Sequence, residues 1–152
     1  MSDGIRLAQE GDLPAIVNLY AQDDFNGDSI SLAQAQAIYR RAFTAPSYSL
    51  WVAEADGKVV ATACLLVMQN IAAMGRPSAI LESVVVDGSF RAGGIGRQLV
   101  AHLCEQAQQA GAYKICLYTS TNADYVHRFY EGLGFKRHGI SYQLNMNEKV
   151  AA

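Results

Sequence analysis

The hydrophobic positions of the chain recur with two different periods, and each change of period marks the expected boundary between a strand and a helix. Runs rich in Val, Leu and Ala that are bounded by Gly, Asp or Pro predict strands. Apolar residues spaced three and four apart predict amphipathic helices. The predicted strands are residues 5–8, 49–55, 59–69, 79–86, 114–119 and 141–146, and the predicted helices are residues 12–20, a segment after Ser31, and residues 94–110 and 123–133.

Turn residues support these boundaries. Asp56-Gly57 between two apolar runs is a strong hairpin signal. Asp12 is a suitable N-cap for the first helix, and Gly111 and Gly134 are suitable stops for the last two. The helix at 94–110 carries its apolar residues on one stripe, formed by Ile95, Leu99, Leu103 and Ala107.

The order of the elements predicts an α/β (α+β) fold. A strand, a helix and a strand over residues 79–119 imply a parallel pair, and the flanking hairpins are antiparallel. We therefore expect a mixed, mostly antiparallel central sheet with a central parallel strand pair and helices on both faces. The 152 residues show no linker, repeat or low-complexity run, which predicts a single domain over residues 1–152.

The most informative stretch is Arg91-Ala92-Gly93-Gly94-Ile95-Gly96-Arg97, which connects a buried strand to a helix. A glycine loop that opens a helix presents backbone N–H groups at the positive end of the helix dipole, and glycines let the backbone approach an anion closely. The two arginines add positive charge on both sides of the loop. This pattern predicts a site for a phosphate-bearing ligand, although a glycine before a helix is also an ordinary turn device.

Two common phosphate loops do not fit. A nucleotide P-loop needs a lysine after its last glycine, and none follows Gly96. A dinucleotide fingerprint needs a glycine or alanine where Leu99 stands, and an acidic residue about 20 positions further on. The pattern Arg/Gln-x-x-Gly-x-Gly/Ala after a Val-rich strand fits at every fixed position.

That loop resembles the acetyl-CoA pyrophosphate loop of the GNAT-type N-acetyltransferases. Phe129-Tyr130-Glu131-Gly132-Leu133-Gly134-Phe135 resembles the family's second signature, and the predicted opening strand and helix and the later hairpin follow in the family's order. The resemblance spans about residues 5–146. It implies the GNAT acyl-CoA N-acyltransferase fold, acetyl-CoA as co-substrate, and direct acetyl transfer to a primary amine in a ternary complex.

The resemblance also implies which residues hold the cofactor. The loop amides from Arg91 to Arg97 would take the pyrophosphate, and the strand before them would bind the pantetheine and acetyl carbonyl through its backbone, at Ser83, Val84, Val85 and Val86. Asn122 stands near a family position that contacts the cofactor. It is eight residues before Tyr130 where the family has seven, so a helix cap is the competing interpretation.

Two residues are candidates for the chemistry. Tyr130 matches the family's general acid, and a phenol with a pKa of about 10 stays protonated at neutral pH. An aromatic core residue is the structural alternative. Glu82 is the charged residue inside the predicted central strand, which suggests that it faces the substrate cleft, where it would accept the amine proton or anchor the substrate.

The acceptor site is expected from three segments: residues 23–28 with Asp24, the second helix, and the loop at 70–77 with Arg76. Residues 70–84 show a weak similarity to the glucosamine-6-phosphate N-acetyltransferase branch, where Arg76 would suit a phosphate. Solvated loop residues are the alternative for both Asp24 and Arg76. A small-molecule amine is the expected acceptor. A protein N-terminus or lysine, or a non-catalytic acyl-CoA-binding module of this fold, are the alternatives.

Composition narrows the remaining classes. A formal charge of −2 gives no general attraction to nucleic acid. The sequence has no apolar run long enough for a membrane segment and no pattern of a secretory leader. We therefore expect a cytoplasmic protein. Cys64, Cys104 and Cys116 are expected to be reduced and mostly buried. The three histidines have no ligand spacing, and no metal is expected. A homodimer is left open.

Overall fold

The computed structural model describes residues 4–22, 30–119 and 122–146 of the chain. By its internal contacts the chain divides into two units, Met1–Leu117 and Tyr118–Ala152. In their described parts, the first unit carries the sheet together with helices α1, α2 and α3, and the second carries helix α4.

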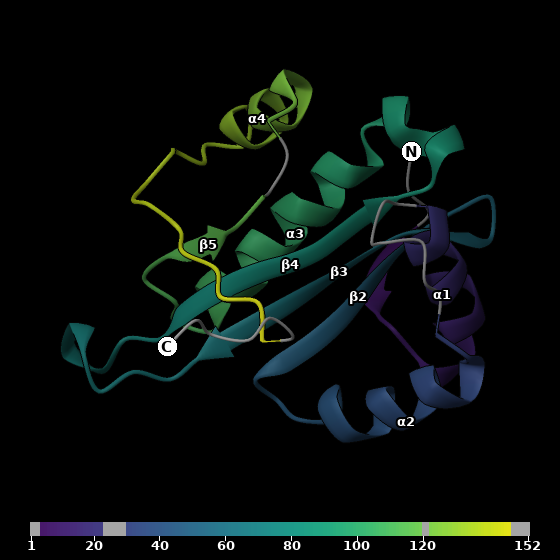
Figure 1. The fold of residues 1–152 in the computed structure, drawn as a ribbon, viewed down its shortest axis with the longest axis horizontal. Coiled ribbons are helices and arrows are strands. Elements are labelled where there is room, and N and C mark those ends of the chain that lie inside the picture. The colour runs from purple at the N-terminus through teal and green to yellow at the C-terminus, as the bar shows by residue number, and fades with distance from the viewer. Residues whose placement is uncertain (1–3, 23–29, 120–121, 147–152) are drawn as a thin grey trace. The chain divides into compact units, whose positions relative to one another are not determined.

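The sheet of the first unit is mixed (Figure 1). Its strands lie in the order β1 (Gly4–Leu7), β2 (Tyr48–Ala55), β3 (Lys58–Met68), β4 (Ser78–Val86) and β5 (Ile115–Leu117). Neighbouring strands are antiparallel, except that β4 and β5 run parallel. The predicted mixed, mostly antiparallel sheet is therefore confirmed, and among the described residues the parallel pair stands at one end of the strand order.

The turn between β2 and β3 has the geometry that its sequence predicts. Asp56 and Gly57 both have positive φ, 52° and 68°. Two left-handed residues in a two-residue loop form the turn whose twist matches a right-handed hairpin, and Asp-Gly is a preferred pair for it.

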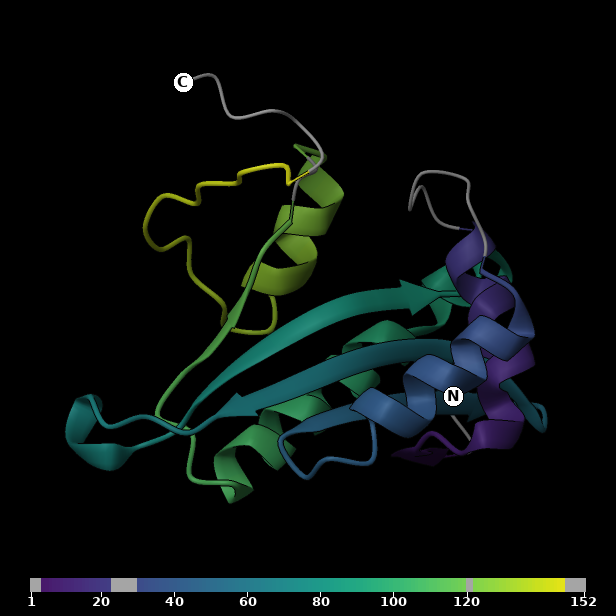
Figure 2. The same ribbon diagram turned by 60° about the horizontal axis from the view of Figure 1, so that its bottom comes forward.

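Helices cover both faces of the sheet, as predicted (Figure 2). The helices of the first unit are α1 (Leu13–Gln22), α2 (Leu32–Ala42) and α3 (Ile95–Gln109). Successive residues of a strand point to opposite faces. Trp51 of β2 contacts His102 of α3, with ring centroids 5.0 Å apart. Its neighbour Leu50 packs with Leu13 of α1. Thus α1 and α3 lie on opposite faces, and α2 shares the face of α1 because its Tyr39 packs against the same cluster.

Helix α3 buries the predicted stripe. Its members are all 2% exposed or less: Ile95, Leu99, Leu103 and Ala107. Full burial of one such leucine is worth about 1.5–3 kcal/mol. Gly111, at φ 81°, ends the helix: its N–H donates to the Gln108 carbonyl at 2.9 Å, and the Ala112 N–H donates to the Ala107 carbonyl at 3.0 Å. This is the Schellman arrangement that a glycine stop predicts.

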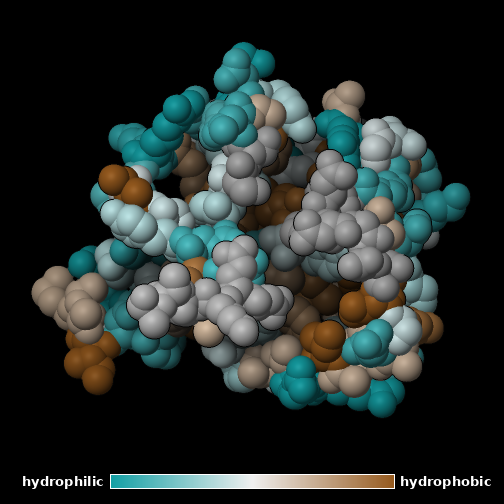
Figure 3. Space-filling view, in the orientation of Figure 1, coloured by the Kyte–Doolittle hydropathy of each residue, from teal (hydrophilic) through white to brown (hydrophobic). Residues whose placement is uncertain are grey.

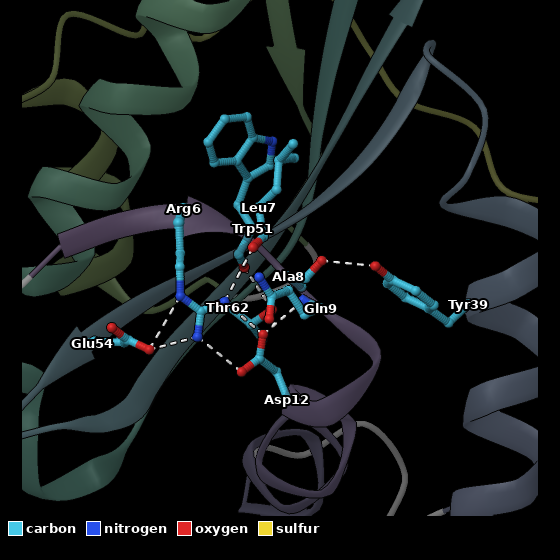
Figure 4. A network of polar contacts seen from close by, with 9 residues as sticks. All are labelled: Arg6, Leu7, Ala8, Gln9, Asp12, Tyr39, Trp51, Glu54 and Thr62. Atoms are coloured by element: carbon cyan, nitrogen blue, oxygen red, sulfur yellow. Dashed lines mark hydrogen bonds and ion pairs between the residues drawn. The ribbon is translucent and has the colours of Figure 1, made fainter.

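A polar network ties β1 to the start of α1 (Figure 4). The Arg6 guanidinium donates to both oxygens of Asp12, at 2.7 and 2.9 Å, and to Glu54 Oε1 at 2.5 Å. Asp12 also accepts the Gln9 N–H at 2.7 Å. The predicted N-cap role of Asp12 is therefore wrong in detail: its carboxylate faces back to Arg6 and Gln9, which precede it, and it closes a 3₁₀ turn at Glu10–Asp12 ahead of α1.

The second unit contains α4 (Asp124–Glu131), which ends two residues earlier than predicted. A turn follows, with Gly134 at φ 92°, and the Phe135 N–H donates to the Tyr130 carbonyl at 3.1 Å. The predicted strand at 141–146 is wrong, because these residues are described without strand structure. Alternating apolar residues fit a strand, but a strand also needs a partner for its backbone groups.

The prediction for the thiols is confirmed only in part. All three cysteines are free, and Cys64 is buried, but Cys104 is half-buried and Cys116 is exposed. Cys116 lies on β5, at one end of the strand order among the described elements, and its side chain is exposed to solvent.

Candidate active site

Strand β4 contains a β-bulge at its centre. The register passes from Cys64↔Glu82 to Thr62↔Val85, so that Ser83 and Val84 oppose one residue of β3. Ser83 adopts φ 53°, a left-handed conformation that costs a residue other than glycine roughly 1–3 kcal/mol. Bulges redirect a strand and frequently stand beside active sites. This one separates the half of β4 that pairs with β5 from the half that leads to the glycine loop.

The second half of β4 has an open backbone edge. Pairing with β5 runs from Ala79 to Leu81 and stops there among the described residues. Residues 83–86 are bonded to β3 on their other side, through Val85 and Val86. Their side chains are buried or half-buried. The backbone N–H and C=O groups of Ser83 to Val86 are the ones that the resemblance assigns to the cofactor, and that role stays a prediction.

The glycine loop follows directly. A 3₁₀ helix at Gly88–Gly93 leads to Gly94, which is at φ 77° and is the N-cap of α3. The left-handed conformation at this position explains the glycine. The first α-helical bond runs from the Gln98 N–H to the Gly94 carbonyl at 3.0 Å. The N–H groups in the first turn of a helix point along its axis, here toward the glycine loop.

The electrostatics of the loop suit an anion. Helix α3 has 15 residues and no acidic residue in its first turn, so the positive end of its dipole is not offset there. Arg91 and Arg97 are exposed on either side. The Arg91 Nε–H donates to the Val86 carbonyl at 3.1 Å, which fixes the arginine against the end of β4.

Asp87 holds the loop in place, a role that the sequence reasoning missed. Its carboxylate accepts the Ser89 N–H at 2.9 Å and the Gln22 side-chain N–H at 3.0 Å, and these hydrogen bonds lower the pKa of Asp87. Gln22 is the last residue of α1, so Asp87 connects the strand, the loop and that helix. An aspartate just after a strand and two residues before a serine amide is the signal that predicts such a turn.

Glu82 is exposed at the centre of β4. Its backbone is the cross-strand partner of Cys64, so both side chains leave the same face of the sheet, the face that α1 covers. Burial is the main cause that raises the pKa of Cys64 and of Tyr48, and the negative charge of Glu82 adds to both shifts. That Glu82 faces the substrate cleft stays a prediction.

A pocket lies on that face, between α1, α2 and the sheet. Its volume is about 320 Å³, at the lower end of the roughly 300–1,000 Å³ found for small-molecule sites. The pocket reaches the bulge, because Ser83 lines it together with Cys64 and Tyr48. Figure 3 shows hydrophobic residues gathered over α2, and Leu32 and Ile38 of this helix are 44% and 38% exposed.

Two phenols flank the Cys64 thiol inside the pocket. The Tyr20 hydroxyl is 4.0 Å from Cys64 Sγ, and the Tyr48 hydroxyl lowers the pKa of the thiol against the larger effect of burial. Burial is the main cause that raises the pKa of Tyr20, Tyr48 and Cys64, so all three stay protonated at neutral pH. Sequence reasoning did not single these residues out, because Tyr and Cys in apolar runs look like ordinary core residues.

Tyr130 belongs to the second unit, near the end of α4. Its ring packs edge-on against Phe129 and Phe135, with centroids 4.9 and 5.7 Å apart. Burial raises the pKa of its phenol, which keeps the hydroxyl protonated well above neutral pH. The geometry within this unit is therefore compatible with both predicted roles, proton donor and aromatic packing residue.

Arg76, Asn122 and Asp24 are the remaining residues that were predicted to contact a ligand. Arg76 lies before β4, at the end opposite to the glycine loop; the nine residues of β4 at about 3.3 Å each separate them. Its guanidinium lies 5.0 Å from the centre of the Tyr113 ring, and it does not line the pocket.

The cap interpretation of Asn122 is wrong, since the N-cap of α4 is Ala123, without a side-chain bond. Asp24 and the rest of its segment lie outside the described residues.

The described residues contain no group of three or more His, Cys, Asp or Glu side chains that could hold a metal ion. None of their helices is both long enough and apolar enough to cross a membrane.

Comparison with known proteins identifies the family. The profile of the acetyltransferase (GNAT) family matches residues 13–135. A solved structure from Agrobacterium tumefaciens str. C58 is 34% identical, with a TM-score of 0.89 over 94% of this chain and 99% of that chain. The chain belongs to the GNAT family of acetyltransferases, and its fold is the one that the resemblance implied.

Two relatives carry a named activity. The chain is 36% identical over 90 residues to the glucosamine 6-phosphate N-acetyltransferase of Trypanosoma brucei brucei, a match that spans 59% of this chain and 59% of that enzyme. The crystal structure of glucosamine-6-phosphate N-acetyltransferase from Arabidopsis thaliana has a TM-score of 0.82 at 23% identity, covering 95% of this chain and 98% of that chain. At this identity, the match to the Arabidopsis structure shows a shared fold only.

Proposed function

We propose that the protein is an acetyl-CoA-dependent N-acetyltransferase that moves the acetyl group to a primary amine by direct transfer in a ternary complex. One arrangement carries this proposal: the open edge of β4 beyond the bulge runs directly into the Gly94 N-cap of α3. It gives a pantetheine chain a backbone to pair with, and gives a pyrophosphate the amides of a helix start.

The start of α3 suits the pyrophosphate of acetyl-CoA. The first turn of α3 has no acid, and Gly93 and Gly94 have no atom within 4 Å of the position where a Cβ would stand. The amides from Arg91 to Arg97 would hold the pyrophosphate. When bound, acetyl-CoA supplies a thioester whose carbonyl carbon accepts the amine and whose sulfur leaves as a thiolate.

Two side chains would move the protons. Glu82 would accept a proton from the ammonium group, directly or through water, because its carboxylate stands exposed beside the bulge where the acetyl carbonyl would lie. Tyr130 would return a proton to the leaving thiolate. Its phenol holds that proton at neutral pH, since burial raises its pKa. Alternatively, Glu82 would only anchor the substrate, and the pH–rate profile of Glu82→Gln distinguishes the two roles.

The size of the pocket is that of a small-molecule site: it measures about 320 Å³ between α1, α2 and the sheet. We infer that a small amine is acetylated, as in the curated relative.

The test is a CoA-release assay with a panel of small amines and lysine peptides, paired with a titration of acetyl-CoA alone. Acetyl-CoA binding together with release that depends on a small amine supports the proposal. Binding without release for any amine would make the protein an acyl-CoA-binding module. Release with peptides only would reassign the acceptor.

A further inference from the structure

The pocket beside Glu82 has an apolar lining. Eight of its lining residues are aliphatic or phenylalanine, among them Leu13, Ile16, Ile38 and Phe43. The others are three tyrosines, Cys64 and Ser83. No Lys, Arg, His, Asp or Glu is among the described residues that line it. A ligand inside this pocket therefore meets hydrocarbon and aromatic rings.

Two of the tyrosine hydroxyls in the lining are already engaged. The Tyr39 hydroxyl donates to the Ala8 carbonyl at 2.8 Å, and the Tyr20 hydroxyl lies 4.0 Å from the Cys64 thiol. A ligand rich in hydroxyl groups would have to break these contacts or leave its own groups without partners. Each buried polar group without a partner costs about 1–3 kcal/mol.

A phosphate is a still poorer occupant. Burial of an anion without a cation carries a penalty of several kcal/mol, and no cationic side chain of the described lining offsets it. Arg76, which the sequence offered as a phosphate ligand, lies on the Tyr113 ring instead. The described pocket therefore does not suit the acceptor that the trypanosomal relative's name specifies.

The charge at the pocket favours an ammonium group. Glu82 shares a face with Cys64, one of the lining residues, and its negative charge reaches both Cys64 and Tyr48. An opposite charge brought beside an exposed carboxylate is favourable, and it would also place the amine next to the bulge.

We propose that the acceptor is a primary amine that carries an apolar group about the size of an aromatic ring, with the apolar group in the pocket and the amine at Glu82. This inference rests on the proposed function and narrows its substrate. The pocket would then bind an arylalkyl or branched alkyl amine and not a sugar phosphate.

The test measures binding apart from catalysis. 2-Phenylethylamine, 3-phenylpropionate and glucosamine 6-phosphate are titrated separately, by calorimetry, into the whole protein saturated with CoA, which cannot transfer an acetyl group. The two phenyl compounds share the ring and differ in the sign of their charge. Phenylethylamine is expected to bind at least about tenfold more tightly than either of the others, a difference of about 1.4 kcal/mol.

Two variants on one helix locate the binding. Ile38 lines the pocket, and its neighbour Ala37 is exposed and does not. Ile38→Arg is expected to weaken phenylethylamine binding at least tenfold, whereas Ala37→Arg leaves it unchanged. Thermal unfolding shows that both variants are folded, and Ile38→Leu, which keeps an apolar lining, should retain binding if Ile38→Arg does not fold.

Each outcome decides one claim. Tight binding of phenylethylamine that Ile38→Arg weakens supports the inference, whatever the turnover. Equal or tighter binding of glucosamine 6-phosphate, or an Ile38→Arg variant that binds phenylethylamine as the wild type does, overturns it. Acetylation of a polar amine with phenylethylamine excluded would overturn the inference and leave the proposed function standing. Phenylethylamine binding without acetylation of any amine would overturn the proposed function alone.

Discussion

Glu82 on β4 and Cys64 on β3 are cross-strand partners, so an exposed carboxylate and a buried thiol leave the same face of the sheet. The next residue along β4, Ser83, begins the bulge and lines the pocket. This relationship puts the charged residue of β4 at the point where three features come together: the apolar pocket, the bulge, and the open backbone edge that leads to the glycine loop.

The first prediction concerns Glu82. If it accepts the amine proton, Glu82→Gln lowers the rate most near neutral pH and much less at alkaline pH. An alkyl amine with a pKa of about 10.4, like that of lysine, needs no base once it is deprotonated. The measurement is the pH–rate profile on the preferred amine, with Glu105→Gln, an exposed glutamate of α3, as the control. A loss confined to KM at every pH would make Glu82 an anchor.

The second prediction concerns Tyr130. Tyr130→Phe removes one hydroxyl and keeps the ring that packs on Phe129 and Phe135. It is expected to retain acetyl-CoA affinity and to lower kcat by about 10²-fold or more, the usual scale for loss of a general acid. Tyr125→Phe, on the same helix and 69% exposed, should keep the wild-type kcat. A Tyr130→Phe enzyme with wild-type turnover would make the residue a packing group.

The third prediction concerns stability and pH. Hydrogen bonds from Arg6 lower the pKa of Asp12 in the folded state. The stability that this carboxylate contributes is therefore present above its unfolded pKa, about 3.9, and is lost as pH falls through the lower folded pKa. Asp12→Asn keeps the shape and should reduce the free energy of unfolding at pH 7 by about 1–3 kcal/mol. Denaturant unfolding at a series of pH values should show this difference shrinking below about pH 4; a constant difference would contradict the account.

The fourth prediction concerns the thiols. Cys64 is 4% exposed and burial raises its pKa, whereas Cys116 is exposed on β5. In variants that keep one cysteine each, a disulfide reagent should modify Cys64 at least about tenfold more slowly than Cys116, since the reaction needs an accessible thiolate. Equal rates under native conditions would mean that the sheet around Cys64 opens readily.

Short sequence patterns predicted the turns and helix ends of the fold well. Asp56-Gly57 specified its hairpin, Gly111 ended α3, and Ser31 caps α2 by accepting the Gln34 N–H at 3.2 Å. These features depend on a few neighbouring residues, so a single sequence contains them. The glycine loop is of the same kind, because its glycines and arginines follow one another directly.

Features that depend on distant partners could not be read in this way. The left-handed conformation falls on Ser83, not on a glycine, and nothing in its neighbourhood marks the bulge that β3 imposes. The alternating residues at 141–146 fit a strand, but a strand forms only where another edge receives it. The pocket unites α1, α2 and three strands, and its tyrosines look like core residues until those elements are assembled.

The central claim is that acetyl-CoA binds with its pyrophosphate on the amides at the start of α3. Gly94 and Gly111 are both left-handed glycines, at φ 77° and 81°, at opposite ends of the same helix. Valine at either position strains the backbone in the same way, but only at Gly94 would it stand between the amides and the anion. Gly111→Val is therefore the matched control.

The decisive measurement is the calorimetric titration of acetyl-CoA into the wild type, Gly94→Val and Gly111→Val, each shown to be folded by circular dichroism. We expect Gly94→Val to weaken binding by well over about tenfold, a loss of more than about 1.4 kcal/mol, and Gly111→Val to bind as the wild type does. Wild-type affinity in a folded Gly94→Val protein would contradict the account.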